Sequence, residues 1–565
     1  MVTLRPIGEC AVLAEVDDLA RVLGLHAALA ASPPAGVDDL VPAARTVLVA
    51  FDPARIAPAA VRAWILSVGQ TLPDATAPGA LVEIPTRYDG PDLEETAGLL
   101  GIRPADLVAR HAAAEWTVAF TGFAPGFAYL VSDAWPHDVP RLARPRTRVP
   151  AGSIGLAGEF TGAYPRPTPG GWRLIGTTDA PLFVPDAPVP VLLTPGARVR
   201  FVPSSPRISV AGAAAEGGDP ASGGQDATRV PSAPGISSPP HVLPPSGAAT
   251  TAGGDSARGG SDVATASSAP GISSPHLPHA GTPALRILAP GAHASVQDLG
   301  RPGRAALGVA RSGALDREAL RVANRLVGNA ESAAGVEILL GGFRARAVSD
   351  TWVAVTGALA DLDVDGRAVD AYTPLLLPAG AELSIGAARA GARLVLAVRG
   401  GVAVPEVMGS RSTDVLAALG PLALRAGDTI PAGRVPDPIP VVDFFPWSVP
   451  DAVIDVDLAR GPRADWFAPA ALRTLSEATW TVSNDADRVG IRLDGPALER
   501  VRRDELPSEG MRPGALQVPP HGRPVVLLAD GPVTGGYPVI AVVTDATLDR
   551  LAQARPGDRV RFRTP

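Results

Sequence analysis

The stretches PGGWRLIGTT at residues 169–178 and VTGGYPVIAVVT at residues 533–544 resemble each other, and this likeness is the strongest indication of the fold. A second related pair precedes them, VPAGSIGL at 149–156 and RPGALQVP at 512–519, and a third follows, PGARVRF at 195–201 and PGDRVRF at 556–562. Three matches in one order, at similar though unequal spacing, predict a duplicated, barrel-like β unit. Its glycines are expected at equivalent turns, where backbone approaches backbone or ligand.

Around these stretches, the chain divides into regions that are mostly β with α+β parts. Residues 1–80 alternate strand-like and helical runs, which predicts a small α+β subdomain. Residues 81–203 are strand-like pieces separated by Gly and Pro turns, typical of a β-barrel. Residues 284–440 and 441–565 are again rich in short strands and predict two further β subdomains. Helices are expected at 17–30, 57–68, 92–101, 315–328 and near 464–475.

Residues 204–283 form a segment of different composition, dominated by Gly, Ser, Ala and Pro. The run SAPGISSP occurs in it twice, at 232–239 and at 268–275. Such a segment cannot bury enough apolar surface to offset the entropy lost on ordering. It is predicted to be a disordered, flexible tether between two halves.

Composition narrows the class of protein. Hydrophobic residues make up 46%, charged residues 19% and the net charge is -7, which indicates no nucleic-acid partner. The first residues have no basic segment followed by an apolar core, and no run approaches the length of a membrane span, so a cytoplasmic location is expected. Cys10 is the single cysteine, which excludes intramolecular disulfides and thiolate metal clusters and predicts a buried structural thiol.

The sequence contains no lysine, so all 50 basic side chains are arginine. This excludes a phosphate-binding loop of the Walker type, a Schiff-base lysine and covalently attached biotin. Any phosphate must therefore be held by arginine, backbone N–H groups or a metal.

Longer motifs carry a family resemblance. In the first half, TGFAPGFAYL (121–130), PRTRVPAGSIGLAG (145–158) and TGAYPRPTPGGWRLIG (161–176) resemble the B subunit of 5-oxoprolinase, also described as the kinase-inhibitor or allophanate hydrolase subunit 1 family. In the second half, SVQDLGRPG (295–303), SGALDREALRVANRLVGN (312–329), GSRSTD (409–414), SNDADRVGIRLDGP (483–496), SEGMRPGALQVP (508–519) and TGGYP (534–538) resemble the C subunit. The same pair of domains recurs in the carboxyltransferase part of urea carboxylase.

The resemblance implies cyclophilin-like β-barrels and a reaction in which 5-oxoproline is opened to glutamate with ATP hydrolysis, together with a separate A subunit. It also implies ATP as a ligand, with Mg²⁺. A five-membered lactam is a stable amide, and phosphorylation of its oxygen would create a leaving group and expose the carbon to water. Such a site needs cations or N–H donors for the phosphoryl group, a base for water and donors for an oxyanion.

In the first half, the candidates for substrate or phosphate binding lie beside turns. Arg146 and Arg148 lie beside the turn of Gly152 and Ser153, which indicates either an anion site or the closed end of a barrel. Phe123 and Gly126, together with Gly171, are candidates for the wall of a pocket for a small ring, although core packing explains the phenylalanine equally well. His111 is either a general acid or base or a structural histidine at a helix end.

In the second half, Gln297, Asp298 and Arg301 indicate either an anion or magnesium site, with Asp298 catalytic, or an internal ion pair. Ser410, Arg411 and Thr413 are candidates for a phosphate or carboxylate clamp.

Ser508 and Glu509 supply the candidate general base, with a surface turn as the alternative. Thr534, Gly535, Gly536 and Tyr537 are candidates for a loop that approaches ligand closely. By contrast, Asn324 and Asn329 are expected to cap or end their helix.

Three positions depart from the family pattern. Phe160 stands where the family usually has glutamine, Thr177 where arginine is common and Val539 where lysine is common. Each substitution removes a polar donor, so the resemblance implies the fold of this chain more strongly than its exact substrate.

Two other functions remain open at this point. One is biotin-dependent carboxyl transfer to urea or another small amide, which would need a separate biotinylated protein. The other is inhibition of a sensor histidine kinase, although retention of the whole second half argues against a pure inhibitor. The two halves are predicted to contact each other in the working state, since the tether raises their effective concentration.

Overall fold

The structure is a computed structural model that describes residues 2–71, 79–204, 281–435, 438–439, 445–449 and 453–563. Nearly all of the predicted tether lies outside these described residues. Thr282 and Pro283, at its predicted end, instead belong to a strand, so the second half starts earlier than expected. The fold is mostly β with α+β parts, as predicted. No helix in the described ranges is long and apolar enough to cross a membrane.

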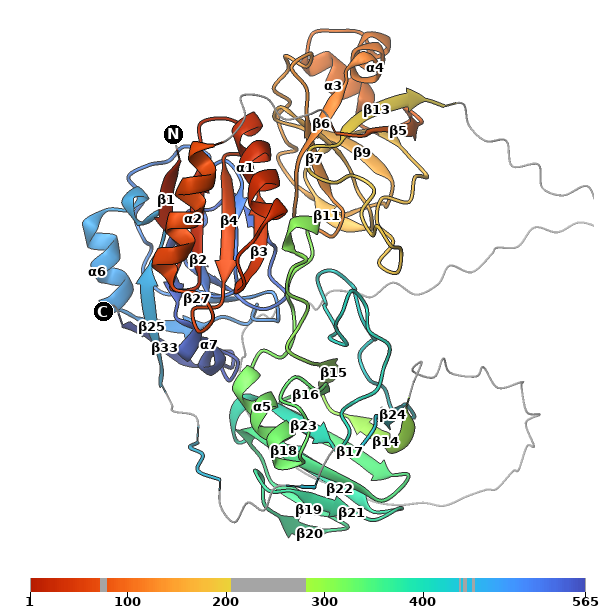
Figure 1. Cartoon of the computed structure of the whole chain (residues 1–565), viewed down its shortest axis with the longest axis vertical. Helices are drawn as coiled ribbons and strands as arrows, with labels where there is room; N and C mark the ends of the chain where they lie inside the picture. Colours follow the sequence, from red (N-terminus) through yellow and green to blue (C-terminus); the bar gives the residue numbers. More distant parts are fainter. Residues whose placement is uncertain are drawn as a thin grey trace, which may run out of the picture. The chain divides into compact units, whose positions relative to one another are not determined.

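The first residues form an antiparallel sheet covered on one face by two helices (Figure 1). Its strands lie in the order β1-β2-β4-β3, and their bounds are β1 (Thr3–Pro6), β2 (Ala11–Glu15), β3 (Val37–Pro42) and β4 (Thr46–Phe51). Helices α1 (Leu19–Ala31) and α2 (Pro58–Gln70) pack Leu25 and Ile65 against Val47 and Val49 of this sheet. The opposite face packs Leu13 and Leu48 against Met511 and Val533. Both faces of the sheet are therefore buried.

The rest of the first half is a seven-stranded sheet, ordered β12-β9-β10-β7-β6-β13-β5, with two helices. The strands are β5 (Leu81–Thr86), β6 (Trp116–Thr121), β7 (Ala128–Val131), β9 (Ser153–Ala157), β10 (Phe160–Ala163), β12 (Arg173–Thr177) and β13 (Arg198–Pro203). A bridge between Arg87 and Thr177 joins the ends of the two edge strands and closes the sheet. The helices are α3 (Leu93–Leu99) and α4 (Pro104–Ala113), and a small ribbon pairs β8 (Arg146–Val149) with β11 (Thr168–Gly170).

Residues 282–432 form two sheets that enclose one apolar core. The six-stranded sheet contains β14 (Thr282–Pro290), β17 (Gly341–Ala347), β19 (Leu362–Val364), β20 (Arg367–Val369), β22 (Glu382–Ala387) and β24 (Thr429–Ala432). The five-stranded sheet contains β15 (His293–Gln297), β16 (Gly335–Leu339), β18 (Thr351–Leu359), β21 (Leu375–Leu377) and β23 (Ala390–Val398). Helix α5 (Arg317–Leu326) packs on the second sheet, and a single helical turn, η1 (Ala305–Leu307), precedes it.

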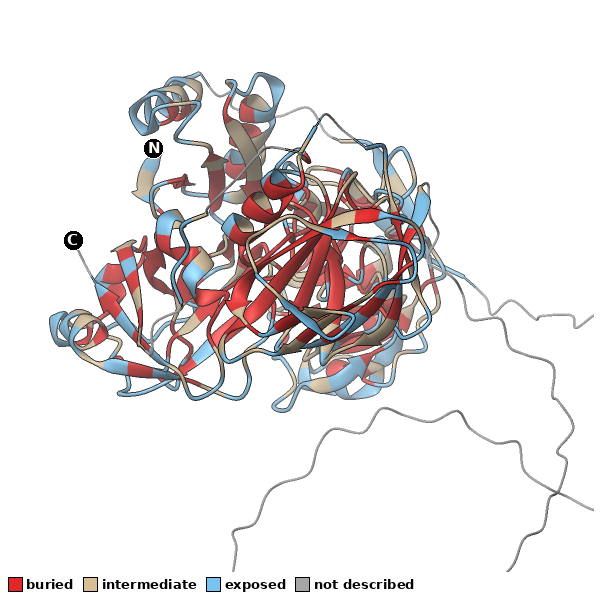
Figure 2. Ribbon diagram, turned by 90° about the horizontal axis from the view of Figure 1, so that it is seen from below, coloured by how far each residue is buried: buried red, intermediate tan, exposed pale blue. Residues whose placement is uncertain are grey.

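The last region is a closed seven-stranded barrel. Its strands are β25 (Val453–Arg460), β26 (Thr479–Val482), β27 (Gly490–Asp494), β29 (Ala515–Gln517), β30 (Val525–Leu527), β32 (Val539–Val543) and β33 (Arg559–Arg563). It also carries η2 (Ala464–Trp466), α6 (Pro469–Glu477), α7 (Asp545–Leu551) and a small pair of strands, β28 (Glu509–Gly510) with β31 (Thr534–Gly535). Figure 2 shows how buried residues concentrate on the strands, while the helices keep exposed residues on their outer sides.

The predicted duplication is confirmed by strand order. In the first barrel the order is β12-β9-β10-β7-β6-β13-β5, and the closed barrel, started at β32, runs β32-β29-β30-β27-β26-β33-β25. The three related sequence pairs fall on equivalent strands, β12 with β32, β9 with β29 and β13 with β33. In both barrels the last strand pairs in parallel with the first.

A buried tryptophan marks the equivalent position in each barrel. The indole N–H of Trp116 donates to the carbonyl of His111 at 3.1 Å, and that of Trp480 donates to the carbonyl of Leu475 at 3.1 Å. Both acceptors lie on the helix that precedes the tryptophan strand. His111 and Leu475 are therefore equivalent residues, and one of them is an ordinary core leucine.

Candidate functional site

The first half contains a small aromatic pocket of about 180 Å³. It is lined by Phe123, Phe127, Tyr129, Arg141, Leu142, Pro145, Tyr164, Gly170, Gly171 and Trp172. Phe127 sits at the centre of the rings, with centroids 5.3 Å from Trp172 and 4.9 Å from Tyr164. Burial raises the pKa of Tyr129 to about 12, so its hydroxyl stays protonated. Of the predicted residues, Phe123 and Gly171 meet here, in a space that suits a small flat ring.

The loop that supplies Phe123 is strained and held by the second half. Phe123 has φ of 64°, a left-handed conformation that costs a non-glycine residue about 1–3 kcal/mol and is typical of functional sites. The hydroxyl of Thr121 donates to the carbonyl of Ala306, and the N–H of Gly126 donates to the carbonyl of Leu307 at 3.0 Å. Gly126 therefore supports the loop from η1 and is not a lining residue of the pocket.

The same loop meets the predicted TGG loop. A Cβ on Gly122 would lie 1.8 Å from Oγ1 of Thr534, which is 6% exposed. Thr534 and Gly535 pair with Gly510 and Glu509 as strands β31 and β28. The carbonyl of Ser508 accepts the N–H of Ala44 at 3.1 Å. Three predicted motifs from both halves thus meet at one point, whereas Tyr537, 44% exposed, projects to the surface.

Glu509, the predicted general base, is 3% exposed and pairs with Arg463. Arg463 donates from Nε to Oε1 of Glu509 at 2.9 Å and from Nη2 to Oε1 of Glu15 at 3.0 Å. Burial raises the pKa of Glu509 although Arg463 opposes this, and Oε2 of Glu509 has no hydrogen-bond partner among the described residues. The surface-turn alternative is wrong for Glu509, because the side chain is buried.

Asp298 and the GSRSTD motif come together, as neither motif alone predicts. The Asp298 carboxylate accepts from the hydroxyl of Ser410 at 2.7 Å, the N–H of Arg411 at 2.7 Å and the N–H of Gly300 at 2.8 Å. Ser412 donates its hydroxyl to the same carboxylate. These donors are neutral, so Asp298 organises two loops and forms no ion pair with Arg301.

The remaining members of this group also bond to protein. Arg411 donates to the carbonyl of Val404 and pairs with Glu406 at 2.7 Å, and Thr413 donates to the carbonyl of Pro421 at 2.8 Å. Gln297 donates to the carbonyl of Thr413 at 3.0 Å. The side chains of the predicted phosphate clamp are therefore already engaged by other protein groups. In the described part of the chain, no group of three or more His, Cys, Asp or Glu residues is placed to hold a metal ion.

Arg301 is 1% exposed and faces a different carboxylate. Its Nη1 lies 3.8 Å from Oδ2 of Asp414, and neither atom has a hydrogen-bond partner among the described residues. Burial, and then the nearby Asp530, raise the pKa of Asp414 to about 6. Arg301 thus belongs to a buried charged interior.

The predicted anion turn of the first half is closed. The N–H of Gly152 donates to the carbonyl of Tyr164 at 2.7 Å, and that of Ser153 to the carbonyl of Pro150 at 3.4 Å, so neither is available to an anion. Arg146 pairs with Asp92 at 2.6 Å, while Arg148 is exposed. The barrel-end alternative describes these residues better than the anion site.

His111 is fully buried in the first barrel. Its Nδ1 lies 2.8 Å from the hydroxyl of Tyr88 and its Nε2 lies 2.9 Å from that of Thr161. Burial lowers the pKa of His111 to about 3. With both nitrogens bonded and no exposure, the placement favours the structural alternative over the acid or base.

The helix-end asparagines and the three positions that depart from the family pattern have structural contacts. The side chain of Asn324 donates to the carbonyl of Ala333 at 2.7 Å, and that of Asn329 to the carbonyl of Val398 at 2.9 Å, which fixes the chain after α5 as expected. Phe160 packs edge-on to Tyr129, with ring centroids 5.7 Å apart, so it supports the aromatic pocket from behind. Thr177 donates to Asp89 at 2.8 Å, and Val539 is buried in β32.

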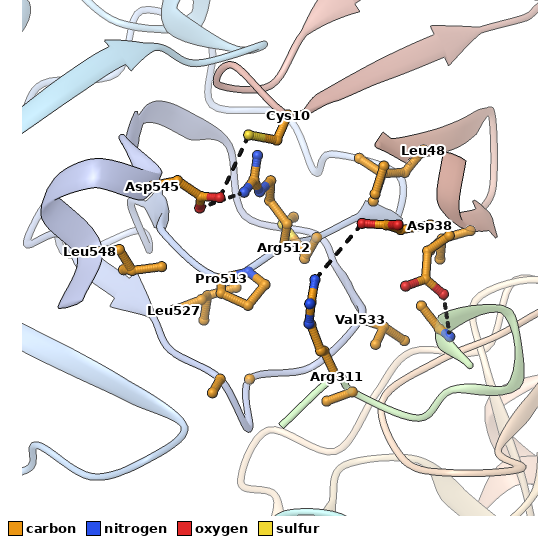
Figure 3. A pocket seen from close by; sticks show the side chains of 18 of the residues that line it. Cys10, Asp38, Leu48, Arg311, Arg512, Pro513, Leu527, Val533, Asp545 and Leu548 are labelled. Atoms are coloured by element: carbon orange, nitrogen blue, oxygen red, sulfur yellow. Dashed lines mark hydrogen bonds and ion pairs between the residues drawn. The ribbon is translucent and has the colours of Figure 1, made fainter. Parts of the chain in front are cut away.

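A second cavity, of about 250 Å³, was not predicted from the sequence (Figure 3). Its lining includes Cys10, Asp38 and Leu48 from the first residues of the chain and Arg311 and Arg512 from the second half. Of these residues, only Arg512 stands in one of the motifs quoted above, SEGMRPGALQVP at 508–519. Only the fold brings them together, because β3 and β4 lie against the last barrel.

Two family models match the chain. The carboxyltransferase domain, subdomain A and B, matches residues 307–564, and the carboxyltransferase domain, subdomain C and D, matches residues 2–193. The chain is 38% identical to the C subunit of 5-oxoprolinase from Escherichia coli K12 over 284 residues, 49% of this chain and 90% of that protein. It is 49% identical to the B subunit of 5-oxoprolinase from Escherichia coli O157:H7 over 125 residues, 22% of this chain and 57% of that protein.

A solved structure resembles the whole chain. The crystal structure of TTHA0988 superposes with a TM-score of 0.78 at 32% identity and covers 100% of both chains. The likeness therefore spans both halves and both family models.

Proposed function

Because the chain belongs to the carboxyltransferase-domain family that includes the B and C subunits of 5-oxoprolinase, we propose that it supplies both subunits of an ATP-dependent 5-oxoprolinase. It would act with a separate A-type subunit and open 5-oxoproline to glutamate in the cytoplasm. The observation that carries the proposal is that one chain resembles the B subunit in its first half and the C subunit in its second.

The aromatic pocket supports a lactam substrate. Its volume, about 180 Å³, is below the roughly 300–1,000 Å³ of sites for drug-sized ligands and suits a single small ring. The lactam would lie against the aromatic wall that Phe127 and Trp172 form together, and Arg141 would bind its carboxylate. The Tyr129 hydroxyl, protonated at neutral pH, would donate to the ring carbonyl.

Contacts between the halves support a site that needs both. Thr121, Gly122 and Gly126 of the pocket loop contact η1 and Thr534 of the second half. A shift of these contacts would move Phe123, which stands in the same loop. We propose that the two halves stay associated in the working state and that this association sets the shape of the pocket.

The nucleotide would arrive as MgATP, a substrate that carries the metal on its own phosphates. Its γ-phosphate would pass to the lactam oxygen, and water would then attack the activated carbon. Glu509 remains the proposed base, since its buried carboxylate has a raised pKa and one oxygen without a partner among the described residues. Arg463 would be the positioning residue that orients it.

Carboxyl transfer is the competing function, because both family models are named for it. The two are separated by incubating the chain with an A-type subunit, MgATP, 5-oxoproline or urea, and labelled bicarbonate. We expect glutamate from 5-oxoproline and no label in any amide product. Transfer of the label to urea, dependent on an added biotinylated carrier protein, would overturn the proposal. If the chain showed no turnover and instead suppressed autophosphorylation of a sensor histidine kinase, the inhibitor alternative would be favoured.

A further inference from the structure

The cavity of about 250 Å³ between the first sheet and the last barrel takes no part in the proposed reaction. Its walls come from segments far apart in the sequence: β3 and β4, the residues after η1, and the segment before β29. Leu48, Leu527 and Val533 form apolar parts of the wall (Figure 3). A molecule in this cavity would touch both halves of the chain.

Charges of both signs surround the cavity in pairs. Arg512 donates to Asp545 at 3.1 Å, and Arg311 lies 3.9 Å from Asp38 (Figure 3). Arg317, which also lines the cavity, lies 3.8 Å from Asp545. The lining contains four arginines and four aspartates, the remaining ones being Arg321, Asp39 and Asp52. The cavity therefore has no net preference for cations or anions.

The pair formed by Arg311 and Asp38 is loose. A separation of 3.9 Å exceeds the range of an N–H···O hydrogen bond, so both groups keep donors and acceptors for another molecule. Burial also raises the pKa of Asp38 and of its neighbour Asp39, against the opposing effect of Arg311. A ligand ammonium beside Asp38 would supply the missing positive charge.

We propose that this cavity binds a small α-amino acid in its zwitterionic form. The α-carboxylate of the ligand would lie beside Arg311, the ammonium beside Asp38, and the methylene groups of the side chain against Leu48 and Val533, so that an acidic side chain would end beside Arg512. Lactam opening creates the free ammonium group, which 5-oxoproline lacks. If the proposed function holds, the cavity recognises the product glutamate and rejects the substrate, and its occupancy reports product to the contact between the halves.

The test measures binding to the purified full chain by titration calorimetry, without an A subunit or ATP. L-glutamate should bind saturably in one site. Arg311→Gln should weaken this binding roughly tenfold or more, since a charge-assisted contact is lost. Arg304→Gln, an exposed arginine of the same segment that does not line the cavity, should leave it unchanged. Ala50→Leu should block binding by filling the cavity.

Binding of 5-oxoproline is the internal control. Any such binding should survive Arg311→Gln and Ala50→Leu, because the aromatic pocket is elsewhere. The inference would be overturned if the chain bound no glutamate at ligand concentrations up to about 10 mM, which corresponds to a binding free energy weaker than roughly 3 kcal/mol. It would also be overturned if glutamate bound and both variants left that binding intact. Because no turnover is measured, a failed oxoprolinase assay and a failed binding assay are separate results.

Discussion

Gly122 and Thr534 touch across the junction of the two halves: a Cβ on Gly122 would lie 1.8 Å from Oγ1 of Thr534. Gly122 stands in the loop that shapes the aromatic pocket, and Thr534 stands in the loop that pairs with Glu509. This contact between the halves therefore connects the loop of the proposed substrate pocket to the strand pair that carries Glu509, the proposed base.

Gly122→Ala should force this contact apart. We expect a loss of about 1–3 kcal/mol in the free energy of unfolding, as for overpacking, and a fall in glutamate formation. Thr534→Ala in the same chain should restore part of both, which a double-mutant cycle would measure as coupling. Gly98→Ala is the matched control, because nothing lies within 4 Å of its Cβ. If the stability losses of the two single variants simply add up in the double variant, the two residues are not coupled and the contact is contradicted.

Arg463→Met should destabilise the chain by about 3–5 kcal/mol near neutral pH, because it leaves Glu509 buried and unpaired. The folded-state pKa of Glu509 is already raised, so its protonated form is favoured on folding, and stability is lost as pH rises through that pKa. Without Arg463 the folded-state pKa of Glu509 rises further, so the pH range over which stability is lost moves to higher pH. Urea unfolding of the variant should therefore show stability regained as the pH is lowered from about 8 to about 5.

Two companions make the Arg463 result specific. Glu509→Gln in the Arg463→Met background should remove the pH dependence, because the buried charge is gone. Arg460→Leu, at an exposed position of β25, should change stability by no more than about 0.5 kcal/mol. A variant of Arg463 that unfolds at the same urea concentration at every pH would refute the role given to Glu509.

His111→Leu should flatten the acid side of the stability profile. The folded-state pKa of His111 is lowered to about 3, so the neutral ring stabilises the fold above the unfolded value of about 6.5. That stability is lost as pH falls, with a slope of up to about 1.4 kcal/mol per pH unit between these values. Leucine is the residue at the equivalent position, Leu475, and should be accommodated.

The control for His111 is His521→Leu, at an exposed position, which should keep the wild-type slope. The pH profile of glutamate formation near neutrality should be the same in all three proteins. A neutral-pH limb that disappears with His111 alone would restore the acid or base role and contradict the structural one.

Arg141→Gln should raise the KM for 5-oxoproline roughly tenfold or more, because the variant cannot pair with the substrate carboxylate. The kcat should change less, since the guanidinium does not act on the reacting carbon. Arg144→Gln, exposed in the same segment but outside the pocket, is the matched control. Equal KM values for the two variants would remove the lactam from this pocket.

The sequence was sufficient for features that repeat or are periodic. The three related motif pairs predicted a duplicated barrel because they lie on strands at equivalent positions, and the helical runs at 17–30 and 57–68 became α1 and α2. Glycine and proline turns marked the strands of both barrels. Local patterns of this kind report on backbone and burial.

The site could not be predicted in the same way, because it depends on contacts between residues that are far apart in the sequence. Asp298 and Ser410 are 112 positions apart, and Arg463 and Glu15 are 448 apart, so no local pattern shows that they bond to each other. Asp38 and Cys10 stand in ordinary strand-like sequence, and they line a cavity only because β3 and β4 pack against the last barrel. For His111, the sequence left both the acid or base role and the structural role open, because it shows the residue type and not the complete burial of the side chain.

The most direct test of the proposed function follows glutamate and ADP together, from 5-oxoproline and MgATP, with the full chain and a cognate A-type subunit. We expect both products to form in equal amounts in the complete mixture, and neither to form when the chain or the A-type subunit is left out. An assembled complex that hydrolyses ATP but releases no glutamate, or that uses another amide in its place, would contradict the proposed function.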